Sequence, residues 1–367
     1  MTFRASFAGH WSNSTFADPV DIYDGDDAQS LIDFCKANHG RHIVGALSYD
    51  FGLKLRKLES RHKNFQPRAV LAAFDSAVEL DVDSANYKVA ASESATSKSR
   101  YIELVDKVKE QIELGNVYQL NLALFMKAQL LEGDANGLWA QLQVPFANNL
   151  LAHLQLGDTE LISASPERFI KISGNRIETE PIKGTRPRAK DREQDESLRE
   201  GLLGSAKEKA ELNMITDLMR NDLAGVSETG SVVVEEGRKI TAHEAVWHAS
   251  SRVSGKLREE LSPIEALLRC LPGGSITGCP KLSAMELIDK YEHQARNFYT
   301  GAIVRIEPTG DLDSSIAIRT IQLTGAEIAL GVGSGIVADS AAAAEWRETI
   351  GKAYILERLS AKITGNA

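Results

Sequence analysis

The order of apolar segments along the chain constrains its fold more than any other feature of the sequence. Runs typical of strands occupy residues 43–49, 117–126, 150–156, 161–172, 299–307, 316–323 and 327–332. Apolar residues at helical spacing predict helices at 101–114, 137–142, 192–200, 205–223, 263–270, 280–290 and 340–360. The two kinds of segment are mixed without the strict β-α-β alternation that produces a parallel sheet. The sequence therefore predicts an α+β protein.

The composition is that of an ordinary globular protein and argues against several functional classes. Of the 367 residues, 43% are hydrophobic and 25% are charged. No apolar run reaches the ~18 residues of a membrane span, and no apolar signal core follows the N-terminus. The net charge of −9 argues against nucleic acid as a partner. Cys35, Cys270 and Cys279 form neither a disulfide framework nor a zinc pattern, so we expect a cytoplasmic protein.

A polar stretch near residues 81–100 is the clearest change of composition in the chain. It includes Asp81, Asp83 and a serine-rich run at 92–99, residue types that favour a connector. We expect it to separate a short N-terminal lobe, residues 1–95, from a larger region, residues 96–367. The N-terminal lobe is expected to contribute strands to a body that both regions share.

Lys183 is the most informative candidate functional residue. Pro181 fixes one backbone angle before it, and Gly184 permits a tight turn directly after it, so we expect a lysine on a constrained loop. Burial or a neighbouring cation, such as Arg186 or Arg188, would lower the pKa of its amine from about 10.4. The neutral amine would then be a nucleophile. A surface lysine in a basic turn is the alternative.

Three carboxylates are candidates for a metal site. Glu211 falls on or beside the buried face of the helix expected at 205–223. Glu345, Glu348 and Lys352 have spacings of three, four and seven, which place them on one helix face. Carboxylates from two helices would suit a hard cation such as Mg²⁺. The alternatives are a solvated edge position for Glu211 and an exposed, ion-paired C-terminal helix.

Two motif matches do not hold. His243 and His248 are five residues apart, whereas a zinc-protease helix requires histidines four apart. The glycine-rich run at 331–336 has isoleucine at the third glycine position of a dinucleotide-binding loop. Exposed backbone amides in this run could still hold a carboxylate.

A series of further motifs, in one order along the chain, resembles the chorismate-utilising enzymes from about residue 43 to about residue 358. The matching segments are 45–50, 118–122, 165–169, the Lys183 segment, 217–223, 272–278, 316–320 and 335–340. The resemblance implies a large body of two layered antiparallel β-sheets with flanking helices that enclose a central cleft. It also implies that residues 96–367 form the chorismate-binding catalytic region.

Two positions sort the reactions within this family. Aminodeoxychorismate synthases carry lysine at the position of Lys183, where anthranilate synthases carry alanine. Isochorismate and salicylate synthases place a water-activating lysine at the position of Gln119, and glutamine cannot act as that base. The chain thus most resembles the aminodeoxychorismate synthase component I branch, which converts chorismate and ammonia to 4-amino-4-deoxychorismate for p-aminobenzoate and folate synthesis. Anthranilate synthase component I and a non-catalytic chorismate-binding regulatory subunit are the alternatives.

The resemblance also implies a role for each site residue. Lys183 would form a covalent intermediate, with Glu167 as the base for the lysine and His248 near the leaving hydroxyl. Mg²⁺ would be held by Glu211 and Glu348, with Glu345 in or near its shell. Substrate contacts are implied for Arg319, Tyr299, Ser275, Thr277, Ser334, Gly335, Lys352 and Thr185.

Each of these roles has a structural alternative. Tyr299 could be a core residue, Arg319 part of a strand salt bridge, and His248 a buried histidine with satisfied hydrogen bonds. The nitrogen source follows from the cysteines, none of which lies in a glycine-flanked nucleophile turn. Ammonia is therefore expected from a separate glutaminase subunit.

Overall fold

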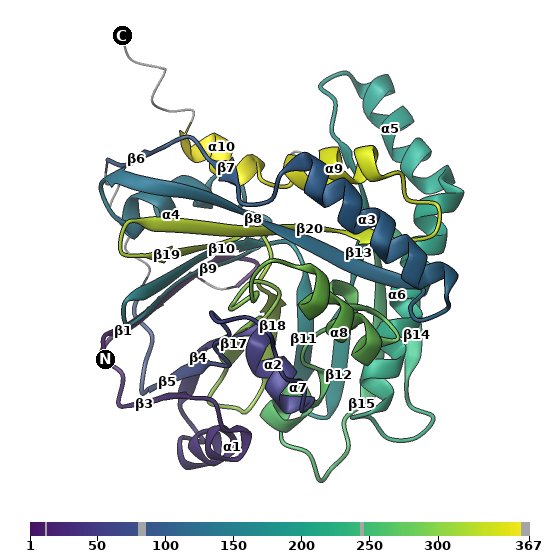
Figure 1. The fold of residues 1–367 in the computed structure, drawn as a ribbon. Coiled ribbons are helices and arrows are strands. Elements are labelled where there is room, and N and C mark those ends of the chain that lie inside the picture. The colour runs from purple at the N-terminus through teal and green to yellow at the C-terminus, as the bar shows by residue number, and fades with distance from the viewer. Residues whose placement is uncertain (12, 80–85, 243–245, 361–367) are drawn as a thin grey trace.

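Two antiparallel β-sheets form the body of the protein. The computed structural model describes residues 1–11, 13–79, 86–242 and 246–360 (Figure 1). Within these residues each sheet has ten strands, and every strand pair is antiparallel. Asp81 and Asp83 of the polar connector lie outside the described residues. Together with the flanking helices, the sheets confirm the expected α+β class.

The first sheet is built around the long pair β8 and β20, which match over ten residues. From one edge to the other, its strands are β16 (Gly278–Cys279), β8 (Gln119–Glu132), β20 (Glu327–Ile336), β19 (Thr320–Thr324), β10 (Thr159–Ser165), β9 (Leu150–Leu156), β1 (Phe3–Gly9) and β2 (Ser14–Phe16), with β6 (Lys88–Val89) and β7 (Glu93–Ser94) beside β8.

The second sheet contains the strand that carries Lys183 at one edge of the main path. Its strands are β13 (Ile182–Pro187), β15 (Val246–Lys256), β12 (Arg176–Glu180), β11 (Arg168–Ser173), β18 (Leu312–Ile316), β17 (Ala302–Ile306), β4 (His42–Leu47), β5 (Ala69–Phe74) and β3 (Asp21–Gly25), with β14 (Val233–Ala242) also beside β15. Strands from the first 95 residues thus enter both sheets.

Helices cover both sheets (Figure 1). They are α1 (Ala28–Ala37), α2 (Tyr49–Leu55), α3 (Lys98–Glu113), α4 (Ala135–Gln143), α5 (Arg192–Gly204), α6 (Ala206–Ala224), α7 (Pro263–Cys270), the 3₁₀ turn η1 (Gly274–Ile276), α8 (Lys281–Tyr291), α9 (Ala342–Gly351) and α10 (Tyr354–Ser360). Helices α3 and α9 pack on β20, and α6 packs on β15. Side chains define where several of them begin: Ser97 caps α3, and Ser262 forms a capping box with Glu265 at α7.

Aromatic side chains connect the sheets near the N-terminus. Phe3 and Phe7 of β1 belong to the first sheet, and Phe74 of β5 belongs to the second. The Phe3 and Phe74 ring centroids are 5.9 Å apart, and Phe16 lies 5.4 Å from Phe74 and 5.9 Å from Phe7. Offset and edge-to-face contacts of this kind stabilise a core beyond the burial of apolar area.

Three expected elements are divided in the structure. The strand expected at 161–172 becomes β10 and β11, because Pro166 between them has no N–H for a neighbouring strand. The strand expected at 316–323 is interrupted at Arg319, whose φ of 48° is left-handed. The helix expected at 340–360 becomes α9 and α10.

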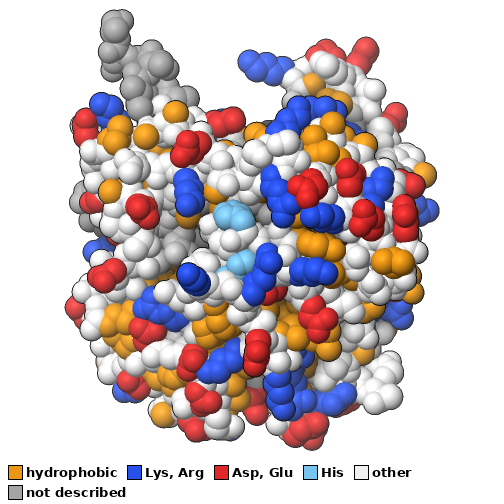
Figure 2. Space-filling view, viewed as in Figure 1, with side chains coloured by type: hydrophobic (Ala, Val, Ile, Leu, Met, Phe, Trp, Pro, Cys, Tyr) orange, Lys and Arg blue, Asp and Glu red, His pale blue; other side chains and the backbone are white. Residues whose placement is uncertain are grey.

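Surface charge is mixed rather than gathered by sign. Figure 2 shows acidic and basic side chains interspersed over one face, with hydrophobic side chains scattered among them. The net charge is −9. An anionic ligand would therefore depend on the few cations that lie inside its own site.

Candidate active site

Lys183 lies on a strand, so the expectation of a loop was wrong. It belongs to β13, which pairs with β15. The pairing shifts between Ile182 and Thr185, and Gly184 has a φ of 94° in that interval. A bulge of this kind re-aims the side chain beside it. The glycine thus has the backbone role that the sequence suggested, within a strand instead of a turn.

The lysine extends from the second sheet towards the first. A Cβ placed on Gly335 of β20 would lie 3.4 Å from the Lys183 Nζ and 2.8 Å from the Gln119 Nε2 of β8. A side chain at this position would have to displace the Gln119 amide. The candidate site therefore lies between the sheets, where β13 faces the start of β8 and the end of β20.

The two arginines that follow Lys183 are paired with carboxylates. Arg186 forms an ion pair with Glu208 at 2.6 Å, and Arg188 forms one with Asp195 at 2.7 Å. Both arginines are thus matched by carboxylates.

The charge of Lys183 affects the pKa of a second lysine, Lys352. Its Nζ donates to the Gly333 carbonyl at 2.9 Å and lies 2.9 Å from the Glu348 Oε1. The protein packed around Lys352 lowers the pKa of its amine, the Lys183 charge adds to this fall, and Glu348 opposes it. Two amines and a glycine-rich strand therefore meet at one place.

Glu167 is a buried carboxylate close to this pair of amines. It lies between β10 and β11 with 7% of its surface exposed. Burial raises its pKa, whereas a 2.6 Å hydrogen bond from the Ser275 hydroxyl and the charges of Lys183 and Arg319 oppose the rise. A carboxylate with a raised pKa beside an amine can exchange a proton with it.

Thr185 and His248 form a second polar pair on the Lys183 side. They are cross-strand neighbours on β13 and β15, and the Thr185 Oγ1 lies 3.0 Å from the His248 Nδ1. His248 is 3% exposed, whereas Thr185 is exposed. His243, the other histidine of the rejected zinc motif, lies outside the described residues.

Arg319 has a strained backbone, with a φ of 48°, and Tyr299 is tightly packed against the first sheet. Arg319 donates from Nη1 to the Tyr354 hydroxyl at 3.1 Å. Tyr299 is buried, which raises its pKa, and it meets Phe125 edge to face at 5.8 Å. A Cβ on Gly331 would lie 2.2 Å from the Tyr299 ring, so the ring rests directly on the β20 backbone.

Two expected substrate contacts have side chains that are occupied elsewhere. The Ser334 hydroxyl lies 3.1 Å from the hydroxyls of Tyr101 and Thr349, beneath α3 and α9. Successive strand residues face opposite sides, so Ser334 points away from the side of Gly335. The Thr277 hydroxyl donates to the Gly273 carbonyl at 2.9 Å. The Ser334 hydroxyl is thus directed away from Lys183, and that of Thr277 is engaged by backbone.

The three expected metal ligands do not form a ready-made cluster. Glu345 is buried and accepts a hydrogen bond from the Ser340 hydroxyl at 2.8 Å. Glu348 contacts Lys352, and Glu211 lies half-buried on α6. In the described part of the chain, no three His, Cys, Asp or Glu side chains are arranged to hold a metal ion. The all-oxygen donor set still fits Mg²⁺, which commonly takes one or two protein carboxylates together with substrate oxygens and water.

Asn121 is a feature of the site that the sequence analysis did not single out. The carboxamide oxygens of Gln119 and Asn121 are buried on β8 and have no hydrogen-bond partner within the described structure. The signal in the sequence was two amides at alternate positions of an otherwise apolar run. Buried polar groups without partners are uncommon in native proteins and call for an explanation such as a ligand or water.

Comparisons with known proteins agree with this architecture. The chorismate binding enzyme family matches residues 83–358. The anthranilate synthase component I structure from Streptococcus pneumoniae superposes with a TM-score of 0.78 at 26% identity, covering 96% of this chain and 89% of that one. No helix in the described residues is long and apolar enough to cross a membrane.

Two curated relatives carry different names. Aminodeoxychorismate synthase component 1 of Escherichia coli is 38% identical over 316 residues, which are 86% of this chain and 66% of that protein. Anthranilate synthase component 1 of Bacillus subtilis is 37% identical over 281 residues, 76% of this chain and 54% of that protein. This chain thus spans between about half and two thirds of these relatives. On the extent of these matches, it belongs to the chorismate binding enzyme family.

Proposed function

We propose that this protein is the chorismate-aminating component of an aminodeoxychorismate synthase. The observation that carries the proposal is the placement of Lys183 between the two sheets, close to the buried carboxylate of Glu167. An amine held there has the reach and the proton acceptor that a covalent lysine mechanism needs. The similarity to the Escherichia coli aminodeoxychorismate synthase component supports the same assignment.

The proposed reaction is a double displacement. The neutral amine of Lys183 attacks ring C2 of chorismate, both double bonds of the ring diene shift by one bond, and the C4 hydroxyl leaves. Glu167 accepts the proton that the lysine loses, and the leaving hydroxyl takes up a proton on the side of His248 and departs as water. Ammonia then adds at C4, both double bonds shift back, and Lys183 leaves C2 as it takes back the proton held by Glu167. The new ammonium group returns a proton to the acid on the His248 side. The net change is replacement of hydroxyl by amine.

The cations of the site would hold the two carboxylates of chorismate. Arg319 and the backbone of β20 near Gly335 would bind the enolpyruvyl carboxylate, and Lys352 would bind the ring carboxylate. Mg²⁺, which Glu211 and Glu348 would hold, supplies charge screening for the ring carboxylate when it is bound.

Anthranilate synthase is the second candidate, because the Bacillus subtilis relative of that name is nearly as similar. Lys183 disfavours it, since that branch carries alanine at this position. In either case a cytoplasmic glutaminase subunit would supply the ammonia.

Product identification with different nitrogen sources tests the proposal. The purified chain should convert chorismate to 4-amino-4-deoxychorismate with Mg²⁺ and ammonium, faster at alkaline pH where free ammonia is abundant. It should be inactive with glutamine alone and should lose activity when the metal is chelated. Anthranilate as the product would select the second candidate. Glutamine-dependent turnover by the isolated chain would contradict the two-subunit arrangement.

A further inference from the structure

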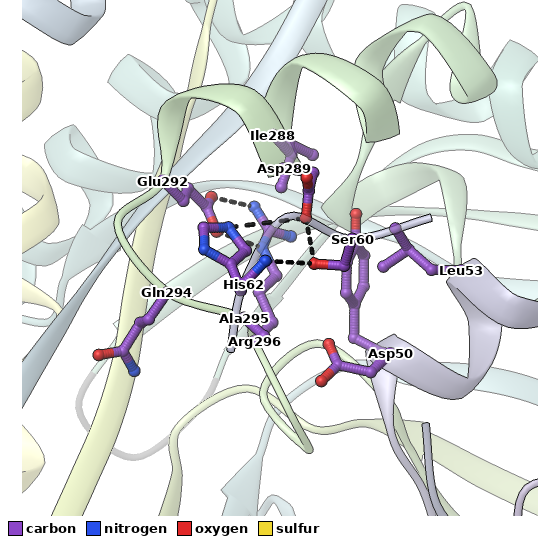
Figure 3. Close-up of a pocket in the computed structure, with 11 residues that line it drawn as sticks. Asp50, Leu53, Ser60, His62, Ile288, Asp289, Glu292, Gln294, Ala295 and Arg296 are labelled. Atoms are coloured by element: carbon purple, nitrogen blue, oxygen red, sulfur yellow. Dashed lines mark hydrogen bonds and ion pairs between the residues drawn. The ribbon is translucent and has the colours of Figure 1, made fainter. Parts of the chain in front are cut away.

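Arg296 is a completely buried arginine that the mechanism above does not use. Its side chain and that of Glu292 are each 1% exposed, and the two face each other beside a small cavity (Figure 3). The Arg296 Nε donates to the Glu292 Oε2 at 2.9 Å. One terminal nitrogen donates to the Ile276 carbonyl at 2.9 Å and the Thr300 hydroxyl at 3.2 Å. The other donates to the Asn121 carbonyl at 2.7 Å and the Glu292 Oε1 at 2.6 Å.

These contacts use every donor that the side chain has. A guanidinium offers five N–H groups in a fixed planar arrangement, and each of the five has its own acceptor here. Two donors serve Glu292, and three serve other parts of the chain. No other side chain could bridge this set of acceptors, because lysine has three donors on a single atom.

Each of the three other acceptors lies beside a candidate site residue in the sequence. These neighbours are Ser275 and Thr277 on either side of Ile276, Gln119 two residues before Asn121, and Tyr299 directly before Thr300. Asn121 lies 175 residues from Arg296 in the sequence, Ile276 lies 20 residues away and Thr300 only four. Arg296 therefore connects, through one rigid group, three walls of the candidate site.

The segment that carries Tyr299 needs such a restraint. Asn297 and Thr300 have left-handed φ values of 51° and 61°, which are unfavourable for residues other than glycine. Conformations of this kind persist only where the surroundings enforce them. Arg296 holds the Thr300 hydroxyl, and the Asp50 carboxylate accepts from the Asn297 N–H at 3.2 Å.

The partner of Arg296 extends the same connection to β8. The Glu292 Oε1 also accepts from the Ala123 N–H at 2.9 Å. The Arg296 guanidinium stacks over Tyr49 at 4.8 Å and lies 5.7 Å from the Tyr299 ring. A buried ion pair is a weak source of stability, because apolar residues of similar volume are often equally stabilising. Apolar residues cannot, however, supply the directed hydrogen bonds by which Arg296 holds its acceptors.

We propose that Arg296 is a positioning residue for the chorismate site. It would set the relative placement of the Ser275–Thr277 turn, the Gln119 amide and the Tyr299 ring. The proposal rests on the proposed function, because it assumes that chorismate binds between these walls. It predicts that weakening this arginine changes substrate binding and not only stability.

Arg296→Lys is the test variant, because it keeps a cation beside Glu292 and avoids leaving a buried carboxylate unpaired. Lysine cannot satisfy all three remaining acceptors, so the walls should separate slightly. We expect the KM for chorismate to rise by about tenfold or more, since displacements of about 1 Å at positioning groups have large kinetic effects. Circular dichroism should show a folded protein, and kcat should change less than KM.

Arg305→Lys is the matched control. Arg305 is also buried, at 7% exposure, and pairs with Glu307 at 2.9 Å while stacking over Phe7 at 4.8 Å. Glu307, Phe7 and Phe16, which Arg305 contacts, are not candidate site residues. A comparable loss of thermal stability with an unchanged KM for chorismate is expected for this variant.

A second variant removes one acceptor of Arg296, a hydroxyl that also donates to the Tyr299 carbonyl at 2.6 Å. Thr300→Val keeps the shape of the side chain but loses the hydroxyl that accepts from Arg296, and it should raise the KM about threefold with little effect on folding. Calorimetric titration with chorismate, without ammonia, separates the two hypotheses. If the wild type does not bind chorismate, the proposed function fails and the positioning role fails with it. If the wild type binds and Arg296→Lys binds equally well, the positioning role alone is wrong.

Discussion

Two buried polar regions of this protein, which meet at β8, differ in how their hydrogen bonds are completed. Every N–H donor of the Arg296 guanidinium has an acceptor. Beside Lys183, the carboxamide oxygens of Gln119 and Asn121 have no partner in the described structure. An unsatisfied buried acceptor costs about 1–3 kcal/mol, so a ligand that donates to these two oxygens would recover that free energy. The first region has the character of a support, and the second that of a binding surface.

We call the region of Lys183, Gln119 and Asn121 the open side and the region of Arg296 and Glu292 the closed side. Substitutions on the two sides should have different effects. Changes on the open side, near Lys183, should affect activity while leaving the free energy of unfolding nearly the same. Changes on the closed side, near Arg296, should affect stability and act on catalysis only through geometry. A substitution near Lys183 that mainly lowered stability, or one near Arg296 that lowered activity without changing stability or geometry, would show that the difference in hydrogen bonding has no functional meaning.

The largest effect is expected for Lys183→Ala. Removing the proposed nucleophile should lower turnover by about a thousandfold or more, because no other group replaces covalent catalysis. Thermal stability should not fall, since the neighbouring Lys352 loses a like charge. Intact mass measured after incubation with chorismate and Mg²⁺, without ammonia, should reveal an adduct on the wild type that the variant lacks.

Lys190→Ala is the control for this experiment, because Lys190 is exposed and lies a few residues further along the chain. It should keep both the adduct and full activity. An adduct of equal yield on Lys183→Ala would place the nucleophile elsewhere.

An intermediate effect is expected in how the free energy of unfolding depends on pH, because of Asp50 on the closed side. Burial raises the pKa of its carboxyl to about 7, against the opposing effects of the Gln66 and Asn297 N–H groups and the Arg296 charge, while Asp289 adds to the rise. Between the ordinary carboxyl value and about 7, the folded state holds a proton that the unfolded state has lost. The free energy of unfolding should therefore fall as pH rises through this window, by up to about 1.4 kcal/mol per pH unit.

Denaturant unfolding between pH 5 and 8 measures this slope. Asp50→Asn should flatten it, whereas Asp75→Asn should leave it unchanged, because Asp75 is 68% exposed and pairs only at the surface with Arg41. An identical slope in the Asp50 variant and the wild type would show that this carboxyl does not titrate with folding.

The fold class and most long elements could be predicted from the sequence. Strand β9 was predicted at its observed bounds, and α6 within one residue at each end. The hairpin of β14 and β15 was not found, because the middle of its first strand is the polar run 235–239 and none of its residues is buried. The strand position of Lys183 was also missed, since a proline and a glycine close to one another favour a turn when the partner strand is unknown.

The arrangement of the site could be predicted only in part. Motifs identified Glu167, Lys183 and Gly335, which the structure brings to one place. They could not show that the Ser334 hydroxyl faces α3 and α9, because the direction of a strand residue depends on register. Nor could they reveal Arg296, because the Asn121 and Ile276 carbonyls that accept from it come from separate segments of the chain.

The smallest effect, and the most specific, is expected for Gln119→Leu on the open side. Leucine has nearly the same size and removes an amide whose oxygen has no partner, so the free energy of unfolding should stay the same or rise slightly. The unpaired oxygen is an acceptor, and ammonia is the reactant that brings N–H donors to the site. The KM for ammonium should therefore rise about tenfold, which corresponds to the loss of roughly 1.4 kcal/mol, while the KM for chorismate changes less. Gln129→Leu, at an exposed position on the same strand, is the control and should alter neither constant. If Gln119→Leu instead destabilised the fold by more than about 1 kcal/mol with unchanged kinetics, Gln119 would belong with the supporting groups around Arg296, and the distinction between the two regions would not hold.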